Sequence, residues 1–247
     1  KSLHYSFQVG EPFQAMQHQA LDVCQQQGVA LRPFFSETLM PPGEILNQQG
    51  NPYVVFTPFY KTLLSQAAAI EPLDQEPGDL SLINLQPSSP KWTGLPTSLT
   101  NLMQKNWAKK LMVHWLVGEK AAWQRLEQFL ESFIADYNHD RDFPALSANS
   151  RLSSHLHFGE INPRAIYFYL QSQFESAQLS EAESSPWLRQ LVWAEFAKTL
   201  LWHFPETEKV PFQQKFKNME WDKNSLEISL WQKGQTGIPI VDAGMRE

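Results

Sequence analysis

The chain has 247 residues, enough for one large domain or two smaller ones with a substantial hydrophobic core. Apolar residues make up 42% and charged residues 19%, which excludes a disordered charged tail. The net charge of −6 argues against a surface coated with positive charge for bulk nucleic-acid binding, but it allows a local basic groove. The single cysteine, Cys24, excludes an internal disulfide framework and a multi-cysteine zinc site. A reducing compartment is the default, and we expect a cytoplasmic protein.

Tryptophan is distributed unevenly along the chain. All nine tryptophans lie between Trp92 and Trp231, so the two ends of the chain are expected to be built differently. No apolar run approaches the ~18 residues that a membrane-spanning helix needs, and we expect no membrane association. The chain begins at Lys1 without a methionine, and we expect it to be a piece of a longer protein.

The first 66 residues have the pattern of an α/β segment. Apolar residues recur at helical spacing from Phe13 to Cys24, Gly28 follows as a stop signal, and residues 29–35 are predicted to form a short strand. Cys24 falls on the apolar face of this helix, which predicts core packing rather than reactivity. Because the segment is too short for a complete doubly wound sheet, we expect residues 1–66 to be the C-terminal remnant of a Rossmann-like α/β domain.

A proline-rich stretch separates this segment from a helical one. Five prolines lie between Pro72 and Pro96 without any periodicity, which predicts an interdomain linker over residues 67–104. Residues 105–247 are expected to form part of a second, mostly α-helical domain. Three helices are predicted there, from Gly118 to Tyr137, from Pro163 through Leu170, and from Ser185 as N-cap with Pro186 as the first helical residue.

Residues 105–125 carry local positive charge. Four lysines and Arg125 oppose a single acid there, and three tryptophans, Trp107, Trp115 and Trp123, are interleaved with them. The pattern is compatible with a phosphate-binding face. It is also that of a solvated helix face whose aromatic rings point inward, and we favour this second interpretation because short basic clusters are common.

Residues 149–157 carry polar side chains that could hold a ligand. Residues 149–153 precede a predicted helix, and their amide and hydroxyl groups are typical helix caps. The start of a helix also binds phosphate, but composition alone favours capping. His155 and His157 alternate nearby, but no acidic residue completes a recognised metal-ligand spacing, so we expect no metal site.

One predicted helix carries a possible ligand face. Trp187, Gln190 and Trp193 follow one another at three-residue steps, which predicts that they share one face of the helix. Two aromatic rings and an amide can hold a planar ligand by stacking and hydrogen bonding. The alternative is a buried aromatic stripe, and the spacing alone favours it.

Four segments, in chain order, resemble signatures of a single family, the DNA photolyases and cryptochromes. Residues 151–161 are similar to the family's "SRLSPYLHFGEI", and residues 187–196 to its "LxWREF" helix. Residues 231–246 resemble "W..G.TG.P.VDA.MR", and residues 51–59 resemble "YxVFTPF" at the end of the first domain. Since the order and the spacing also agree, the resemblance covers nearly the whole chain.

The resemblance implies an N-terminal α/β domain that can hold an antenna chromophore, such as a folate or a deazaflavin, and a helical domain that encloses FAD. It implies light-driven repair, in which an electron passes from reduced FAD to a cyclobutane pyrimidine dimer flipped out of DNA, the dimer splits, and the electron returns. The implied partner is DNA that contains pyrimidine dimers, and we expect a monomer. Two alternatives stay open: a cryptochrome photoreceptor without repair activity, and a flavin-free helical binding module.

The resemblance also implies roles for individual residues. The implied FAD-binding residues are Tyr137, Asn149, Ser150, Arg151, Leu152, Ser153 and Trp187. The implied DNA and substrate surface consists of Arg141, Gln190, Trp193, Ala194 and Glu195. Gln190 and Trp193 would act at the substrate, where Trp193 would stack on the flipped dimer. Trp221 would be the outermost tryptophan of an electron-relay chain.

Two positions depart from the family pattern. Gln190 stands where many cyclobutane-dimer photolyases have glutamate, and glutamine can hydrogen-bond the carbonyl of the dimer but cannot share a proton with it. Ala194 replaces the arginine of the "WREF" helix, which removes a fixed positive charge near the site. Several FAD contacts of the family match no residue of this chain, so we expect the chain by itself to bind FAD weakly or not at all.

Overall fold

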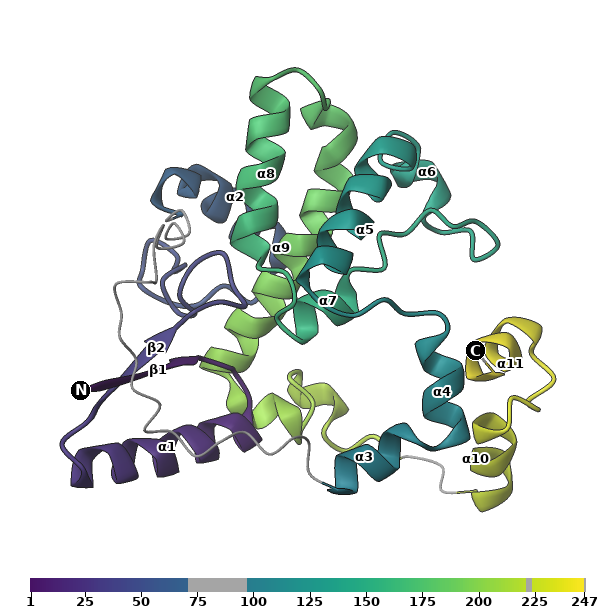
Figure 1. Ribbon diagram of the computed structural model, residues 1–247, viewed down its shortest axis with the longest axis horizontal. Helices are drawn as coiled ribbons and strands as arrows, with labels where there is room; N and C mark the ends of the chain where they lie inside the picture. Colours follow the sequence, from purple (N-terminus) through teal and green to yellow (C-terminus); the bar gives the residue numbers. More distant parts are fainter. Residues whose placement is uncertain (71–96, 221–223, 247) are drawn as a thin grey trace. The chain divides into compact units, whose positions relative to one another are not determined.

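The computed structural model describes residues 1–70, 97–220 and 224–246 (Figure 1). By its internal contacts the chain divides into two units, Lys1–Pro205 and Glu206–Glu247, which are described separately. The proline-rich part of the predicted linker and the predicted relay residue Trp221 lie outside the described residues.

The first unit begins with a single β-α-β arrangement. Strand β1 (Ser2–Ser6) pairs in parallel with β2 (Ala30–Phe34), and helix α1 (Glu11–Gln26) connects them. The sequence predicts α1 and β2 correctly, and Cys24 is buried as expected, with 8% of its surface exposed. These two strands are the only sheet in the part of the chain that the structure describes, so the larger Rossmann-like domain stays a prediction.

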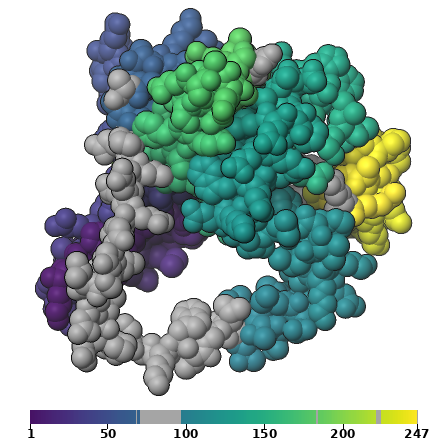
Figure 2. Space-filling model, turned by 45° about the horizontal axis from the view of Figure 1, so that its top comes forward, coloured from purple at the N-terminus to yellow at the C-terminus, as the bar shows by residue number. Residues whose placement is uncertain are grey.

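Four helices of the first unit share one hydrophobic core. They are α2 (Phe56–Ser65), α5 (Glu119–Ser132), α8 (Pro163–Glu175) and α9 (Glu181–His203). Helix α9 contacts α2, α8 and the short α6 (Tyr137–Asp140). Side chains with no exposed surface fill the centre, among them Phe59, Phe129 and Leu170. In the space-filling view the green surface of this unit adjoins the teal surface directly (Figure 2).

Shorter helices complete the first unit. They are η1 (Ala67–Ala69), α3 (Thr97–Met103), α4 (Asn106–Met112) and α7 (Ser153–His157). Helix α3 lies inside the stretch predicted as linker, so that stretch contains helical residues, and the linker bounds of 67–104 stay a prediction. The hydrophobic cluster also joins Leu39 and Phe56 to the later helices. Such contacts occur within a single domain and also between two packed domains. They therefore do not test the domain boundary at residue 66, which stays a prediction.

Helix boundaries show where local patterns mislead. Helix α8 begins at Pro163 as predicted, and the Asn162 side chain caps it by accepting the Arg164 N–H at 2.8 Å. Helix α9, in contrast, begins at Glu181 and contains Pro186 in its interior, whereas the sequence placed the start at Ser185. The Ser184 N–H already donates to the Ser180 carbonyl at 3.1 Å, so helical bonding is established before the proline is reached. Pro186 lies beyond the first turn, so it removes one backbone hydrogen bond of the helix and its ring also crowds the carbonyl four residues earlier.

Helix α5 is shorter than predicted. Gly118, at φ 103°, provides the positive φ of the turn before Glu119, as the glycine suggests. The helix ends at Ser132 because Phe133 adopts a non-helical backbone with φ −133°. Tyr137 then lies on α6, and this break is what lets its ring reach the same hydrophobic cluster.

The second unit contains the short 3-10 helix η4 (Gln214–Phe216) and helices α10 (Ser225–Gln232) and α11 (Pro239–Arg246). Another short 3-10 helix, η3 (Pro205–Glu208), begins at the last residue of the first unit. Asp242 of α11 fixes the loop between the two helices, because its carboxylate accepts the Thr236 N–H and hydroxyl, both at 2.7 Å, and the Gly237 N–H at 3.0 Å. The Thr236 hydroxyl is the largest influence that lowers the pKa of Asp242. Part of the signature at residues 231–246 therefore has a structural role, because Asp242 holds the loop that precedes α11.

The described residues contain no helix with the length and apolar character needed to cross a membrane. They also contain no cluster of three or more potential metal ligands from His, Cys, Asp and Glu.

Candidate functional site

A cavity of about 350 Å³ in the first unit gathers about half of the predicted site residues. Seven of them line it: Ser150, Leu152, Ser153, Trp187, Gln190, Ala194 and Glu195. They come from α9 and from the segment that leads into α7, which are far apart in the sequence. Tertiary packing thus joins two of the segments whose resemblance carried the sequence interpretation.

One face of α9 forms the longest wall of the cavity. Trp187, Gln190 and Ala194 lie at helical spacing along this face, and Trp187 is 5% exposed. Trp193 is not on it, and the prediction of one shared face was wrong for this residue. Each three-residue step falls about 60° short of a full turn, so the first and third positions diverge by about 120°.

Trp193 packs against α2 instead. Its ring is stacked on Phe56 with the ring centroids 3.6 Å apart and the planes at 7°. Tyr60 also stacks on Phe56, with the two ring centroids 5.6 Å apart. Trp193 nevertheless stays 43% exposed, so part of the indole remains available to a partner.

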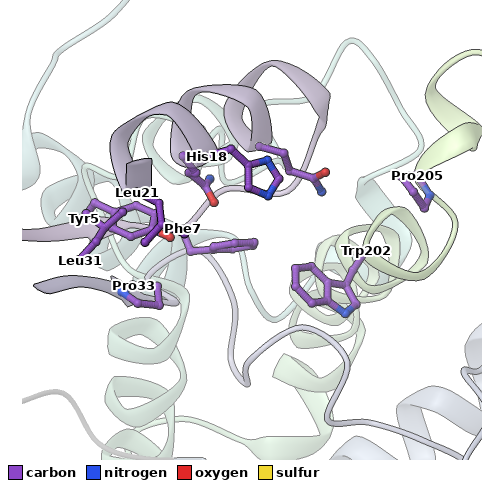
Figure 3. Close-up of a pocket in the computed structure, with 10 residues that line it drawn as sticks. Tyr5, Phe7, His18, Leu21, Leu31, Pro33, Trp202 and Pro205 are labelled. Atoms are coloured by element: carbon purple, nitrogen blue, oxygen red, sulfur yellow. The ribbon is translucent and has the colours of Figure 1, made fainter. Parts of the chain in front are cut away.

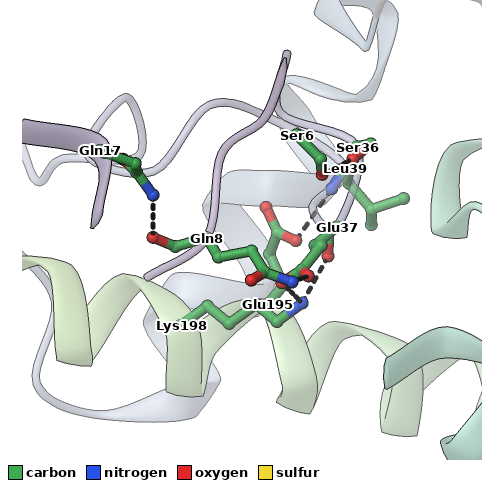
Figure 4. Close-up of polar contacts among 8 residues, drawn as sticks. All are labelled: Ser6, Gln8, Gln17, Ser36, Glu37, Leu39, Glu195 and Lys198. Atoms are coloured by element: carbon green, nitrogen blue, oxygen red, sulfur yellow. Dashed lines mark hydrogen bonds and ion pairs between the residues drawn. The ribbon is translucent and has the colours of Figure 1, made fainter. Parts of the chain in front are cut away.

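Glu195 joins the cavity wall to the segment after β2 (Figure 4). Its carboxylate accepts the backbone N–H groups of Leu39, at 2.9 Å, and Met40, at 3.1 Å. The side chain is 4% exposed, and this burial raises the pKa of Glu195 to about 7, against the opposing effect of the two backbone donors and of the Lys198 and Arg164 cations. The structure therefore gives Glu195 a clear structural role, which the sequence did not predict.

A second polar link lies beside the first. The Lys198 ammonium donates to the Glu37 carboxylate at 3.0 Å and to the Glu37 carbonyl at 2.9 Å. The Gln8 amide donates to the other oxygen of Glu37 at 2.6 Å. Both Glu37 and Lys198 line the cavity, and sequence reasoning missed them. Glu37 carries no local signal, because its partner is 161 residues away. Lys198 could have been found from its helical spacing to Ala194.

Tyr137 and Arg141 lie away from the cavity lining. Tyr137 is 5% exposed and meets Phe129 edge-on, with the centroids 5.7 Å apart. Phe129 in turn contacts Trp187 at 5.2 Å, so Tyr137 supports the cavity wall through one intervening ring. The Arg141 guanidinium lies over the Tyr137 ring at 5.8 Å and 3.8 Å from the Asp142 carboxylate.

The segment before α7 does not cap that helix. The N-cap residue is Leu152, with no side-chain hydrogen bond, and α7 has only five residues. The expectation of side-chain capping was therefore wrong, and so short a helix has little dipole to attract a phosphate. Asn149 is exposed, and Arg151, at φ 54°, belongs to the lining of a different cavity from that of its neighbours Ser150 and Leu152.

The cavity has a donor set that suits part of a flavin dinucleotide. Trp187 offers an aromatic surface, Gln190 an amide, and Ser150 and Ser153 offer hydroxyls. The neighbouring Ser154 hydroxyl is buried and makes no hydrogen bond to any described residue. The cavity volume of about 350 Å³ is at the small end for ligand pockets, so these residues can enclose only part of so large a cofactor.

A second, larger cavity of about 500 Å³ lies between the β-α-β arrangement and the end of α9 (Figure 3). Phe7 and His18 face it from the N-terminal side, and Trp202 and Pro205 from the other. The rings of Phe7 and Trp202 meet edge-on with their centroids 5.4 Å apart. The lining is therefore aromatic, with polar edges supplied by glutamine and histidine side chains.

Comparison with known proteins agrees with this architecture. A family model described as the FAD binding domain of DNA photolyase matches residues 187–247, and one described as DNA photolyase matches residues 1–78. The chain belongs to the DNA photolyase/cryptochrome family. The deoxyribodipyrimidine photo-lyase of Agrobacterium fabrum is 34% identical over 223 residues, which are 89% of this chain and 45% of that protein. The chain spans about half the length of the curated photolyases it matches.

Solved structures of the family have the same fold. A bacterial class III photolyase from Agrobacterium tumefaciens matches with a TM-score of 0.83 at 29% identity, over 99% of this chain and 50% of that one. A cryptochrome from Synechocystis matches with a TM-score of 0.79 at 22% identity, over 100% of this chain and 50% of that one. The second likeness concerns the fold alone. The predicted membership of the photolyase/cryptochrome family is confirmed.

Proposed function

We propose that this chain is part of a light-dependent photolyase that repairs cyclobutane pyrimidine dimers in DNA. The observation that carries the proposal is the single cavity that Ser150, Leu152, Ser153, Trp187 and Gln190 line together. These residues come from two segments that resemble the flavin and substrate segments of the family. When bound, reduced FAD would supply on illumination the electron that splits the dimer, and it would take the electron back afterwards.

The residues of the chain would divide the work of binding. Trp187 and the two serines would hold parts of FAD, and Gln190 would donate its amide N–H to a carbonyl of the dimer. Because glutamine cannot give up a proton, Gln190 would orient the dimer without proton transfer. Ala194 lines the cavity where the family pattern has arginine, so FAD would lack one charged contact here.

Trp193 would contribute the stacking surface for the flipped dimer. One face of its indole lies on Phe56, and the exposed 43% of the residue supports a role for the remaining surface. Trp193→Ala should weaken binding to dimer-containing DNA by about 1–3 kcal/mol, the usual worth of one stacked base. Trp107→Ala, which removes a comparably exposed tryptophan of α4, is the matched control and should leave the affinity unchanged.

The activity is tested with the longest natural protein that contains this chain, purified with its flavin reduced. Under blue light the number of thymine dimers in a damaged oligonucleotide should fall, and it should stay constant in the dark. If flavin is bound but illumination leaves the dimers intact, the repair proposal is wrong. The chain by itself should bind FAD weakly or not at all, and a flavin absorbance band near unit stoichiometry would contradict that expectation.

A flavin photoreceptor without repair activity is the second candidate. It is favoured by the packing of Trp193 on Phe56, which keeps this tryptophan off the cavity wall that Trp187 and Gln190 form. The same illumination experiment separates the two candidates. Photoreduction of bound flavin without loss of dimers would support the photoreceptor.

We propose the 500 Å³ cavity as the site of an antenna chromophore, such as a folate or a deazaflavin. Its aromatic lining suits a planar heterocycle, and Gln14, Gln17 and His18 could bond the polar edge. Trp202→Ala should abolish the near-ultraviolet or blue absorbance of a bound chromophore. If neither a folate nor a deazaflavin binds, this assignment is wrong.

We further propose that the protein acts as a monomer, and that it acts in the cytoplasm, in keeping with its single cysteine.

A further inference from the structure

A third cavity, of about 310 Å³, lies between α5, α7 and the segment that follows α4. Two arginines, Arg125 and Arg151, line it together with Trp115 and His155. Among the residues that the structure describes, its lining includes no aspartate or glutamate and shares no member with the lining of the 350 Å³ cavity. It is therefore a separate site with a cationic wall.

Within the described part of the chain, no carboxylate pairs with the charge of Arg125. Its guanidinium donates to the carbonyls of Ser150, at 2.8 Å, and Asn149, at 3.0 Å, and to the Gln128 side chain at 3.2 Å. These bonds use three of the five N–H donors of the group, so two stay available. No ion pair joins either Arg125 or Arg151 to an acid within the described ranges. Burial, and after it the nearby charge of Arg151, lowers the pKa of Arg125, which agrees with two cations placed close together.

The backbone is arranged to present Arg151. This residue has φ 54°, a left-handed conformation that costs a non-glycine residue about 1–2 kcal/mol. Arg125 holds the two carbonyls just before it and so stabilises this conformation. Strain of this kind often accompanies ligand sites, because only a well-determined surrounding preserves it.

An aromatic ring stands beside the two arginines. Trp115 meets the His155 ring edge-on, with the centroids 6.5 Å apart, and His155 is 5% exposed. His155 is itself fixed by Glu160, whose carboxylate lies 2.6 Å from its Nδ1 atom. The indole thus rests on an anchored neighbour, and such a ring can stack on a nucleobase.

We propose that this cavity binds the phosphate group of a nucleotide, free or within a DNA strand, through Arg125 and Arg151, with the base against Trp115. Guanidinium groups match phosphate oxygens in geometry and charge, and their hydrogen bonds to phosphate are stronger than neutral ones. The sequence favoured a solvated face for the basic cluster at residues 105–125. Arg125 and Trp115 of that cluster instead meet Arg151 at one cavity, and only the fold brings these three together.

The test titrates the chain with deoxyadenosine monophosphate and, separately, with a short single-stranded oligonucleotide. Binding is followed by calorimetry and by the indole N–H resonance of Trp115, which is assigned with Trp115→Phe. Arg151→Gln should weaken binding of at least one probe by about tenfold or more, as expected for lost charged hydrogen bonds. Arg151→Lys, which keeps the charge, should retain part of the affinity. Lys109→Gln on α4 is the control, because this exposed cation does not line the cavity.

The two probes distinguish the two sources of phosphate. Loss of mononucleotide binding in Arg151→Gln identifies a nucleotide site, and a loss confined to the oligonucleotide identifies a contact to a DNA strand. Equal affinities of Arg151→Gln and the parent chain for both probes would overturn the proposal, as would an equal weakening by Lys109→Gln. Neither probe requires flavin or light, so these outcomes are independent of the repair assay.

Discussion

The buried carboxylate of Glu195 should make the stability of the first unit depend on pH. Burial raises its pKa from the ordinary 4.5 to about 7, and two backbone donors and two cations do not offset that effect. Between these two pH values the folded chain keeps the proton that the unfolded chain has lost. The contribution of Glu195 is therefore fully present below pH 4.5 and is lost as the pH rises to about 7.

The size of the effect follows from the same two values. A tenfold change in an equilibrium constant corresponds to about 1.4 kcal/mol, so a rise from 4.5 to about 7 corresponds to about 3 kcal/mol of unfolding free energy. Glu195→Gln removes the titration and leaves one of the Leu39 and Met40 N–H groups without a good acceptor. The unfolding free energy of the parent chain minus that of the variant should thus fall by about 3 kcal/mol between pH 4 and pH 8, because only the parent chain loses stability as the pH rises.

The assay is urea unfolding at a series of pH values, followed by tryptophan fluorescence. Glu175→Gln, at the exposed end of α8, is the control and should show a difference from the parent chain that does not change with pH. A difference for Glu195→Gln that stays constant, or grows as the pH rises, would refute the reasoning. It would mean that the Leu39 and Met40 donors hold the carboxylate in its charged form.

Three further substitutions test the packing. Gly43→Ala should lower the urea midpoint by the equivalent of about 1–3 kcal/mol, because Gly43 has φ 93° and a Cβ atom there would lie 2.8 Å from the Trp202 indole nitrogen. Phe129→Ala should cost about 3–5 kcal/mol in the same assay, since this ring has no exposed surface. Asp242→Asn should reduce the helix content of the second unit, measured by circular dichroism at neutral pH. The lowered pKa of Asp242 means that its contribution is present above the ordinary carboxyl range and lost as the pH falls through the lowered value, so parent and variant should converge in acid.

Each of these substitutions has a matched control. Gly50→Ala, at φ 76° with open space around it, should cost less than Gly43→Ala, because it suffers backbone strain without a clash. Phe158→Ala, at a ring that is 76% exposed, should change stability by less than about 0.5 kcal/mol. Glu227→Gln removes an exposed acid of α10 and should leave the acid transition of the second unit unchanged. A control as damaging as its partner would show that the named contact is not the cause.

The sequence by itself determined the elements with strong local signals. Pro163 marks the start of α8, Gly118 precedes α5, and the apolar spacing before Gly28 predicts α1. These features depend on the φ preferences of proline and glycine and on helical periodicity, which act within a few residues. The same local signals misplaced the start of α9, because nothing near Pro186 reveals that the helix is already established at Glu181.

The resemblance to photolyases predicts about half of the residues that line the 350 Å³ cavity. Leu152 and Trp187 belong to different motifs, yet they line one cavity as the resemblance implies. It could not show that Arg151 turns to another cavity, because one residue with positive φ reverses the direction of a side chain. Nor could it show that Trp193 stacks on Phe56, since that contact depends on how α2 packs against α9.

Only the tertiary structure decided the long-range polar contacts. Glu195 bonds to backbone groups 155 and 156 residues away, and Glu37 pairs with Lys198 across 161 residues. The phosphate site proposed at Arg125 and Arg151 likewise depends on the docking of α5 against the segment before α7. The burial and charge of these side chains depend on which helices and segments pack together. No local sequence pattern predicts that packing, because it depends on the whole fold.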